Sequence, residues 1–143
     1  MSSFKFLEAK DNFYQTSLFF PMPVVMISTL TEDGKTTCGP YSLLAPYYIA
    51  GKDYYAFILM TRNSSNTCQN LLKNPHCAIN FLPDNKKFFK ESVRMGWPGD
   101  TPEEKMKNCI YNFEDGQMCE IDKESKRPQV ISDTFQVVEC TWV

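Results

Sequence analysis

The fold is decided by residues 54–70, which read YYAFILMTRNSSNTCQN. Their first half, Tyr54–Thr61, is rich in aromatic and aliphatic residues and predicts a buried strand. The second half is rich in serine, asparagine and threonine, which cap helices, and Asn74-Pro75 then ends the helix. The stretch therefore predicts a strand followed by a short helix over Ser65–Lys73.

The start of this helix is a candidate anion site. Backbone N–H groups in the first turn have no partner within the helix, and the helix dipole is positive there. Arg62 adds a guanidinium that can hold a phosphate through two hydrogen bonds, and hydroxyl groups follow at Ser64, Ser65 and Thr67. From these residues alone, a capped surface helix and a phosphate site are equally good interpretations.

Helical spacing predicts a polar face and a core face for the same helix. The polar face is expected to carry Asn63, Asn66, Asn70 and Lys73, and the core face Cys68, Leu71 and Leu72. A thiol at Cys68, in the first turn, would be stabilised as a thiolate, but its apolar neighbours favour a buried, inert cysteine.

Other segments of the chain predict further strands and helices. The Asp33-Gly34 pair is a strong hairpin signal, and an antiparallel meander is expected. The Thr-Pro-Glu-Glu sequence at 101–104 is a good helix start. Strands are expected at 24–30, 36–42, 76–82 and 134–143, a short strand at 118–121, and a helix over 101–111. This order favours a small β-barrel with helical additions.

Bulk properties exclude several classes of protein. The 143 residues contain 15 basic and 17 acidic residues without a basic stripe, which argues against a nucleic acid or an anionic membrane as partner. The six cysteines form no C-x-x-C pair and His76 is the only histidine, so no metal site is expected. No signal peptide or membrane span is seen, so the cytoplasm is the expected location, with reduced cysteines.

Three passages together resemble the flavin reductase-like family, whose members fold as FMN-binding split β-barrels. The resemblance covers about residues 20–83, with a weaker echo at 102–105. The passages that carry it are Pro23–Thr29 with Asp33-Gly34, then Gly39–Ser42, then Arg62–Thr67 with Asn70-Leu71 and Asn80.

The resemblance implies a set of flavin-binding residues and no catalytic acid or base. The isoalloxazine ring would be lined by Ser28, Thr29, Pro40, Tyr41 and Ser42. The phosphate would be held by Arg62, Ser64, Ser65, Thr67 and Asn70. Without the resemblance, Ser28 and Thr29 are ordinary strand residues and Tyr41 is a half-buried aromatic residue.

The implied protein is an FMN-binding oxidoreductase that moves hydride or electrons between NADH or NADPH and flavin, as a homodimer. The expected fold is mainly β with helical additions (α+β), a single antiparallel split-barrel domain over residues 1–143. Because the chain stops at Val143 within a strand-like run, we expect the barrel to be incomplete at the C-terminus. A non-catalytic FMN-binding protein and a degenerate split barrel that serves only as an interaction domain are the alternatives.

Aromatic residues outside the motifs allow two interpretations each. Tyr47, Tyr48, Tyr54 and Tyr55 can stack on a flavin or pack in a core or dimer interface. The segment 94–100, with two glycines around Trp97, is either a mobile loop over a pocket or a loop fixed by its tryptophan.

Overall fold

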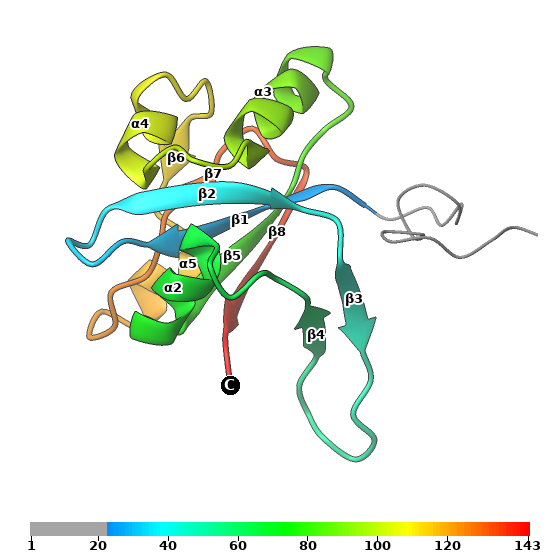
Figure 1. Cartoon of the computed structure of the whole chain (residues 1–143). Helices are drawn as coiled ribbons and strands as arrows, with labels where there is room; N and C mark the ends of the chain where they lie inside the picture. Colours follow the sequence, from blue (N-terminus) through cyan, green and yellow to red (C-terminus); the bar gives the residue numbers. More distant parts are fainter. Residues whose placement is uncertain (1–22) are drawn as a thin grey trace, which may run out of the picture.

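A four-stranded antiparallel sheet with the order β2-β1-β5-β8 is the centre of the protein, as seen in a computed structural model that describes residues 23–143 (Figure 1). Residues 1–22, which the sequence assigns to the same domain, lie outside the described residues. The strands are β1 (Val25–Leu30), β2 (Thr36–Tyr41), β5 (His76–Phe81) and β8 (Gln136–Thr141). The expected strands at 24–30, 36–42, 76–82 and 134–143 are thereby confirmed, with some ends shorter.

The predicted hairpin joins β1 to β2. Gly34 has φ +79°, a left-handed conformation that glycine adopts without a steric penalty, and its N–H donates to the Thr31 carbonyl at 2.9 Å. The register pairs Leu30 with Thr36 and continues to Val25 with Tyr41. Every residue of β1 is buried because this strand lies between β2 and β5.

The sheet has a separate hydrophobic core on each face, because side chains alternate along a strand. One core contains Val25 and Ile27 of β1, and the other contains Met26. Helix α2 (Asn66–Lys73) packs its Leu71 into the first core. Helices α3 (Lys86–Gly96) and α4 (Pro102–Lys107) contribute Phe88, Met95 and Met106 to the second. The helices therefore cover both faces.

The predicted meander is wrong beyond the first hairpin. Strand β4 (Ala56–Leu59), shorter than the expected 54–61, pairs with β3 (Leu44–Tyr47) in a separate two-stranded sheet. The β3–β4 hairpin extends away from the main sheet (Figure 1). Its pairing starts at Leu44 opposite Leu59 and ends at Tyr47 opposite Ala56, so β4 has its partner close by in the sequence.

Residues 108–133 differ most from expectation. Helix α4 ends at Lys107 instead of Tyr111, and a helix, α5 (Gln117–Ile121), replaces the short strand expected at 118–121. The Glu139 carboxylate accepts a hydrogen bond of 3.0 Å from the Met118 N–H in the first turn of α5. A contact between positions 21 residues apart cannot be read from local propensity. Two short strands, β6 (Phe113–Glu114) and β7 (Val130–Ile131), precede and follow this helix in the sequence and pair with each other.

A buried asparagine attaches β7 to the main sheet. Asn80 is fully buried, and its amide donates to the Met26 carbonyl at 3.0 Å and to the Ser28 hydroxyl at 2.9 Å. Its side-chain oxygen accepts a bond of 2.9 Å from the Ile131 N–H. Because both ends of the amide are bonded, the polar group is tolerated in the core.

No helix among residues 23–143 is long and apolar enough to cross a membrane.

Candidate functional site

A cleft of about 700 Å³ runs along the outer edge of β2. Gly39 and Tyr41 of β2 face helix α2, and Cys38 and Pro40 face α3 and α4; residues of both kinds line the cleft. The cleft therefore follows the edge of the strand and not one face of the sheet. The other lining residues are Thr37, Ser42, Leu43, Met60, Thr61, Arg62, Asn66, Thr67, Met95, Gly96, Pro98 and Lys105.

The free backbone of β2 is available to a ligand in this cleft. Among residues 23–143, β2 is the outermost strand of its sheet, and no strand of that part of the chain pairs with the backbone N–H and C=O groups on its outer side. Gly39, at the middle of the strand, has no side chain to cover them. A Cβ at Gly39 would lie 3.5 Å from the Thr67 Oγ1 atom, already in van der Waals contact, so any larger side chain would extend into the space between β2 and α2.

The start of α2 opens into the same cleft. Ser65 is the N-cap, and its Oγ accepts a hydrogen bond of 3.1 Å from the Cys68 N–H. The next two residues, Asn66 and Thr67, occupy the first turn and line the cleft, and their N–H groups have no partner within the helix. The predicted helix start is thus confirmed, and its positive end faces the cleft.

A cluster of hydroxyl groups supports this helix start. The Thr61 and Ser65 Oγ atoms are 2.7 Å apart, and the Tyr41 hydroxyl lies 3.3 Å from Thr61 and 3.4 Å from Ser65. These contacts link the ends of β2 and β4 to α2. The cluster fixes the helix start relative to the strand edge.

The charged side chains that line the cleft are Arg62 and Lys105, and no carboxylate of residues 23–143 is among the lining residues. Arg62 is exposed and forms no ion pair within the described part of the chain. Lys105 uses its ammonium group as a donor to the Met95 carbonyl at 2.9 Å. A cleft with two cations and a helix N-terminus is suited to an anion.

The structure brings half of the predicted ligand-binding residues to the cleft: Pro40, Tyr41, Ser42, Arg62 and Thr67. Ser28 and Thr29 are fully buried in β1, and Asn70 donates to the Thr29 Oγ1 atom at 3.0 Å in the interior. The side chains of these three residues are used inside the protein. Ser64 and Ser65 are also outside the cleft lining.

The predicted faces of α2 need correction at two positions. Asn70, expected on the polar face, is buried, and Leu72, expected in the core, is 59% exposed. The core face carries Thr67, Asn70 and Leu71. The reason is the bond between Asn70 and Thr29, which gives a buried amide its partner. Cys68 is half-buried.

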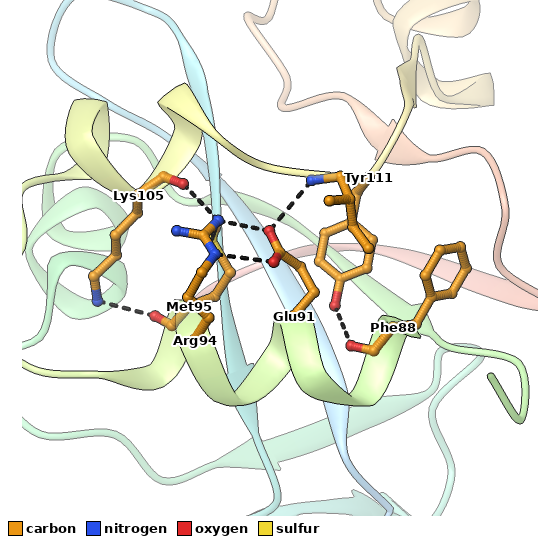
Figure 2. Close-up of polar contacts among 7 residues, drawn as sticks. Phe88, Glu91, Arg94, Met95, Lys105 and Tyr111 are labelled. Carbon is orange, nitrogen blue, oxygen red and sulfur yellow. Dashed lines mark hydrogen bonds and ion pairs between the residues drawn. The ribbon is translucent and has the colours of Figure 1, made fainter. Parts of the chain in front are cut away.

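Sequence reasoning missed the contribution of α3 and α4 to the cleft, through Met95, Gly96 and Lys105. Figure 2 shows how the two helices are joined: Arg94 donates to Glu91 through Nε at 2.9 Å and through Nη2 at 2.5 Å, and to the Lys105 carbonyl at 2.9 Å. Glu91 also accepts the Ile110 N–H at 3.2 Å. In the sequence, the only indication of this link was that Glu91 and Arg94 lie three positions apart, a spacing at which opposite charges on a helix can pair.

The Glu91 carboxylate is held in its charged form. Hydrogen bonds from Arg94 lower the pKa of Glu91 below its ordinary value of 4.5. Burial of the carboxyl group opposes this shift, and the hydrogen bond from the Ile110 N–H adds to it. A lowered folded-state pKa stabilises the protein above the ordinary pKa, and this contribution is lost as the pH falls through the lowered value. Glu91 therefore positions Lys105 at neutral pH by holding Arg94.

Replacing Glu91 with glutamine is expected to lower the free energy of unfolding by about 2 kcal/mol at pH 7, because the Arg94 guanidinium loses its charged partner. The difference from the wild type should begin to shrink as the pH falls below 4.5 and should be lost below the lowered folded-state pKa, where the wild-type carboxylate becomes protonated. Urea unfolding at pH 7 and pH 3 measures both. A deficit that stays constant with pH would show that packing, and not charge, carries the effect.

A second, shallower hollow of about 460 Å³ continues from the cleft past Pro40, Tyr41 and Ser42. Helix α3 lines it with Phe89 and Val93, and Trp97 follows at the end of the helix. Trp97 is 65% exposed, so the interpretation of a loop fixed by its tryptophan is wrong. The first part of the expected loop, residues 94–96, belongs to α3.

No group of three histidine, cysteine or acidic residues that could hold a metal ion is found within residues 23–143. No protein-family model matches the sequence, and a search of curated proteins gave no significant match.

Solved structures, in contrast, match the fold over most of the chain. A flavoredoxin of Desulfovibrio vulgaris (Miyazaki F) superposes with a TM-score of 0.73 at 13% identity, covering 99% of this chain and 67% of the flavoredoxin. The 2-nitrobenzoate 2-nitroreductase of Pseudomonas fluorescens gives a TM-score of 0.70 at 16% identity, covering 92% of this chain and 58% of the reductase. This is the flavin reductase-like fold.

A third match is the NADH:FAD oxidoreductase of Streptomyces globisporus, solved with NAD and FAD fragments. It superposes with a TM-score of 0.63 at 11% identity, covering 85% of this chain and 62% of the oxidoreductase. The chain thus spans between 58% and 67% of the length of these three proteins. The predicted α+β split-barrel fold with antiparallel sheets is confirmed, and within residues 23–143 the sheets do not close into a barrel.

Proposed function

We propose that this protein binds FMN in the cleft along β2 and acts as a flavin-dependent oxidoreductase with NADH or NADPH as co-substrate. The observation that carries the proposal is the cleft itself: it combines a helix N-terminus and two cations with a strand edge that no other strand of residues 23–143 covers. A flavin mononucleotide has the matching parts, a phosphate at one end and a flat ring with hydrogen-bonding edges at the other.

The phosphate end fits the start of α2. The Arg62 guanidinium, the Thr67 hydroxyl and the N–H groups of the first turn all lie at the cleft and can donate to phosphate oxygens. Asn70, Ser64 and Ser65 are left out of this set, because Asn70 is bonded to Thr29 and Ser65 caps the helix. The cleft volume of about 700 Å³ lies in the range of small-molecule sites.

The ring end fits the edge of β2. Pro40, Tyr41 and Ser42 line both the cleft and the adjoining hollow, and the backbone of the strand can donate to and accept from the ring edge. When bound, the flavin supplies the hydride and electron chemistry. The chain supplies orientation, through β2, and positive charge, through Arg62 and Lys105.

The adjoining hollow is our candidate for the nicotinamide co-substrate. Phe89, Val93 and Trp97 give it an apolar wall directly beside Pro40 and Ser42. Aromatic and aliphatic side chains of this kind pack against flat rings. The S. globisporus oxidoreductase, which shares the fold, was solved with NAD and FAD fragments.

The β3–β4 hairpin supports a homodimer as part of the proposal. A two-stranded hairpin is marginally stable on its own, and this one carries exposed apolar side chains. A second copy would cover them. The exposed residues are Tyr47, Tyr48, Tyr54, Tyr55 and Ile58. We further propose that residues 1–143 act as one domain and work in the cytoplasm.

A non-catalytic FMN carrier is the second candidate. It would hold FMN in the same cleft and would need no nicotinamide in the shallower hollow beside it. The two candidates differ in one measurement, the consumption of NADH or NADPH by the loaded protein.

Flavin retention tests the proposal. Purified protein mixed with FMN and passed through gel filtration should carry the visible absorbance of flavin. Gly39→Val should lose this absorbance, because its side chain fills the space between β2 and Thr67 while valine suits a strand.

Gln136→Val, at an exposed strand position on β8, is the matched control and should keep the flavin. Thermal unfolding of the flavin-free variants shows whether each is folded. A colourless wild type whose melting temperature does not rise with FMN would refute the proposal.

A further inference from the structure

The two cations that line the cleft belong to different walls. Arg62 precedes α2, and its carbonyl accepts a hydrogen bond of 2.9 Å from the N–H of the N-cap residue Ser65. Lys105 belongs to α4 and lines the cleft together with Met95 and Gly96 of α3. The proposed phosphate site uses the first cation and gives the second no specific task.

Lys105 is held in place at two points (Figure 2). Its backbone carbonyl accepts a hydrogen bond of 2.9 Å from Arg94 Nη2, and its Nζ atom donates to the Met95 carbonyl at 2.9 Å. The Glu91 carboxylate holds the Arg94 guanidinium in turn. An ammonium group has three N–H donors, so two of them remain for a ligand.

The Lys105 ammonium group has no counter-ion in the described part of the chain. It takes part in none of the ion pairs of residues 23–143, and no carboxylate of these residues lines the cleft. The neighbouring Glu104 uses its carboxylate to accept the Thr101 N–H at 2.9 Å. The positive charge of Lys105 is therefore available to a ligand in the cleft.

The Lys105 ammonium group lies on the side of the cleft where the flavin ring is proposed to bind. The Met95 carbonyl, to which it donates, directly precedes Gly96. Gly96 comes so close to β2 that a Cβ on it would lie 3.0 Å from the Pro40 Cγ atom. Pro40 is one of the residues proposed for the ring, whereas Thr67, proposed for the phosphate, lies on the α2 side of the same strand.

Hydride transfer changes the charge of a flavin ring. A hydride ion carries one proton and two electrons, so its transfer from NADH or NADPH yields the oxidised nicotinamide and a reduced ring with one negative charge. Reduced FMN free in solution takes up a second proton when the pH lies below neutrality. A nearby cation favours the anion instead, and its effect is larger where protein partly replaces water.

We propose that Lys105 compensates the negative charge that the flavin ring gains when it accepts a hydride. The proposal deepens the proposed function and rests on it. In this role Lys105 contacts the cofactor, while Arg94 and Glu91 are positioning residues that act through the Lys105 backbone. The cleft would thus have one cation for the phosphate and a second cation for the reduced ring.

The first experiment uses the unaltered protein loaded with FMN. Its midpoint potential is measured anaerobically at several pH values around pH 6, and the dependence on pH gives the number of protons taken up with the two electrons. Uptake of about one proton is expected, because the cation keeps the reduced ring anionic, whereas free FMN takes up nearly two. Uptake of nearly two protons by the bound flavin would overturn the proposal.

The second experiment assigns the effect to a residue. Lys105→Met should raise the proton uptake to nearly two at pH 6. At pH 8 it should lower the preference for reduced over oxidised FMN by about 100-fold, which corresponds to about 60 mV in the two-electron potential. Its affinity for oxidised FMN should change little, because the oxidised ring carries no charge.

Two further variants serve as controls for the second experiment. Lys105→Arg retains the charge and should keep the wild-type proton count. Lys107→Met removes an exposed cation from the same helix that does not line the cleft, and it should behave as the wild type does. A folded Lys105→Met protein with an unchanged proton count would overturn the proposal, as would an equal change in Lys107→Met.

The role of Lys105 and the proposed function fail in different ways. Retained flavin that takes up nearly two protons at pH 6 in the wild type would overturn the role of Lys105 alone. A wild type that retains no flavin would overturn both. Circular dichroism checks that Lys105→Met is folded, and if it is not, the measurement on the wild type decides.

Discussion

Replacing Arg62 and Thr67 together with alanine is expected to weaken FMN binding by about 100-fold and to leave riboflavin binding almost unchanged. Riboflavin has the same ring and ribityl chain but no phosphate. Both residues line the cleft at the start of α2, and Arg62 is not engaged in an ion pair within residues 23–143. A hydrogen bond to a charged group contributes about 1.5–3 kcal/mol. The loss of two such bonds, at the lower value, weakens binding by about 100-fold.

Fluorescence titration with the two ligands measures the difference directly. Lys73→Ala is the matched control, because it removes a cation from the opposite end of the same helix, where Lys73 pairs with Glu32. This control should bind both ligands as the wild type does. Equal losses of FMN and riboflavin in the double variant would show that the start of α2 is not the phosphate site.

Asn80→Leu is expected to cost about 3 kcal/mol of stability, although leucine is similar in size to asparagine. The substitution leaves the Ile131 N–H without its acceptor and the Ser28 hydroxyl without a donor, and both groups are fully buried. Each buried polar group without a partner costs about 1–3 kcal/mol. For a protein of this size, the melting temperature should fall by about 10 °C.

Calorimetry of Asn80→Leu beside Asn112→Leu checks this result. Asn112 is exposed and donates to the Asp133 carboxylate at 3.2 Å, so its replacement should change the free energy of unfolding by less than about 1 kcal/mol. Similar losses in the two variants would contradict the role given to the buried network. The contrast separates burial from the mere loss of an amide.

The elements that could be predicted from the sequence are those with a local cause. The Asp33-Gly34 turn fixes the first hairpin, and Ser65 caps α2 as expected. The capping box at the start of α4 was also predictable: Glu104 N–H donates to Thr101 at 3.2 Å, and Thr101 N–H donates back to Glu104 at 2.9 Å. In each case the signal lies within a few residues.

The parts that could not be predicted depend on distant partners. Asn70 is buried because Thr29 receives its amide, 41 positions away. α5 is a helix because Glu139 caps it from β8. The cleft itself depends on β2 being an edge strand, which follows from the pairing of β5 with β1. Single-residue patterns carry none of this information. The start of α2 could therefore be predicted, and the α3–α4 wall of the cleft could not.

The outer edge of β2, which no strand of the described residues 23–143 pairs with, has a consequence for the behaviour of the protein in concentrated solution. An open strand edge is a template on which another extended chain can add by main-chain hydrogen bonds. A ligand that lies along this edge would bind the same backbone N–H and C=O groups and would prevent another chain from adding there. Removal of the ligand would therefore be expected to make the protein more prone to aggregate, quite apart from any loss of catalysis.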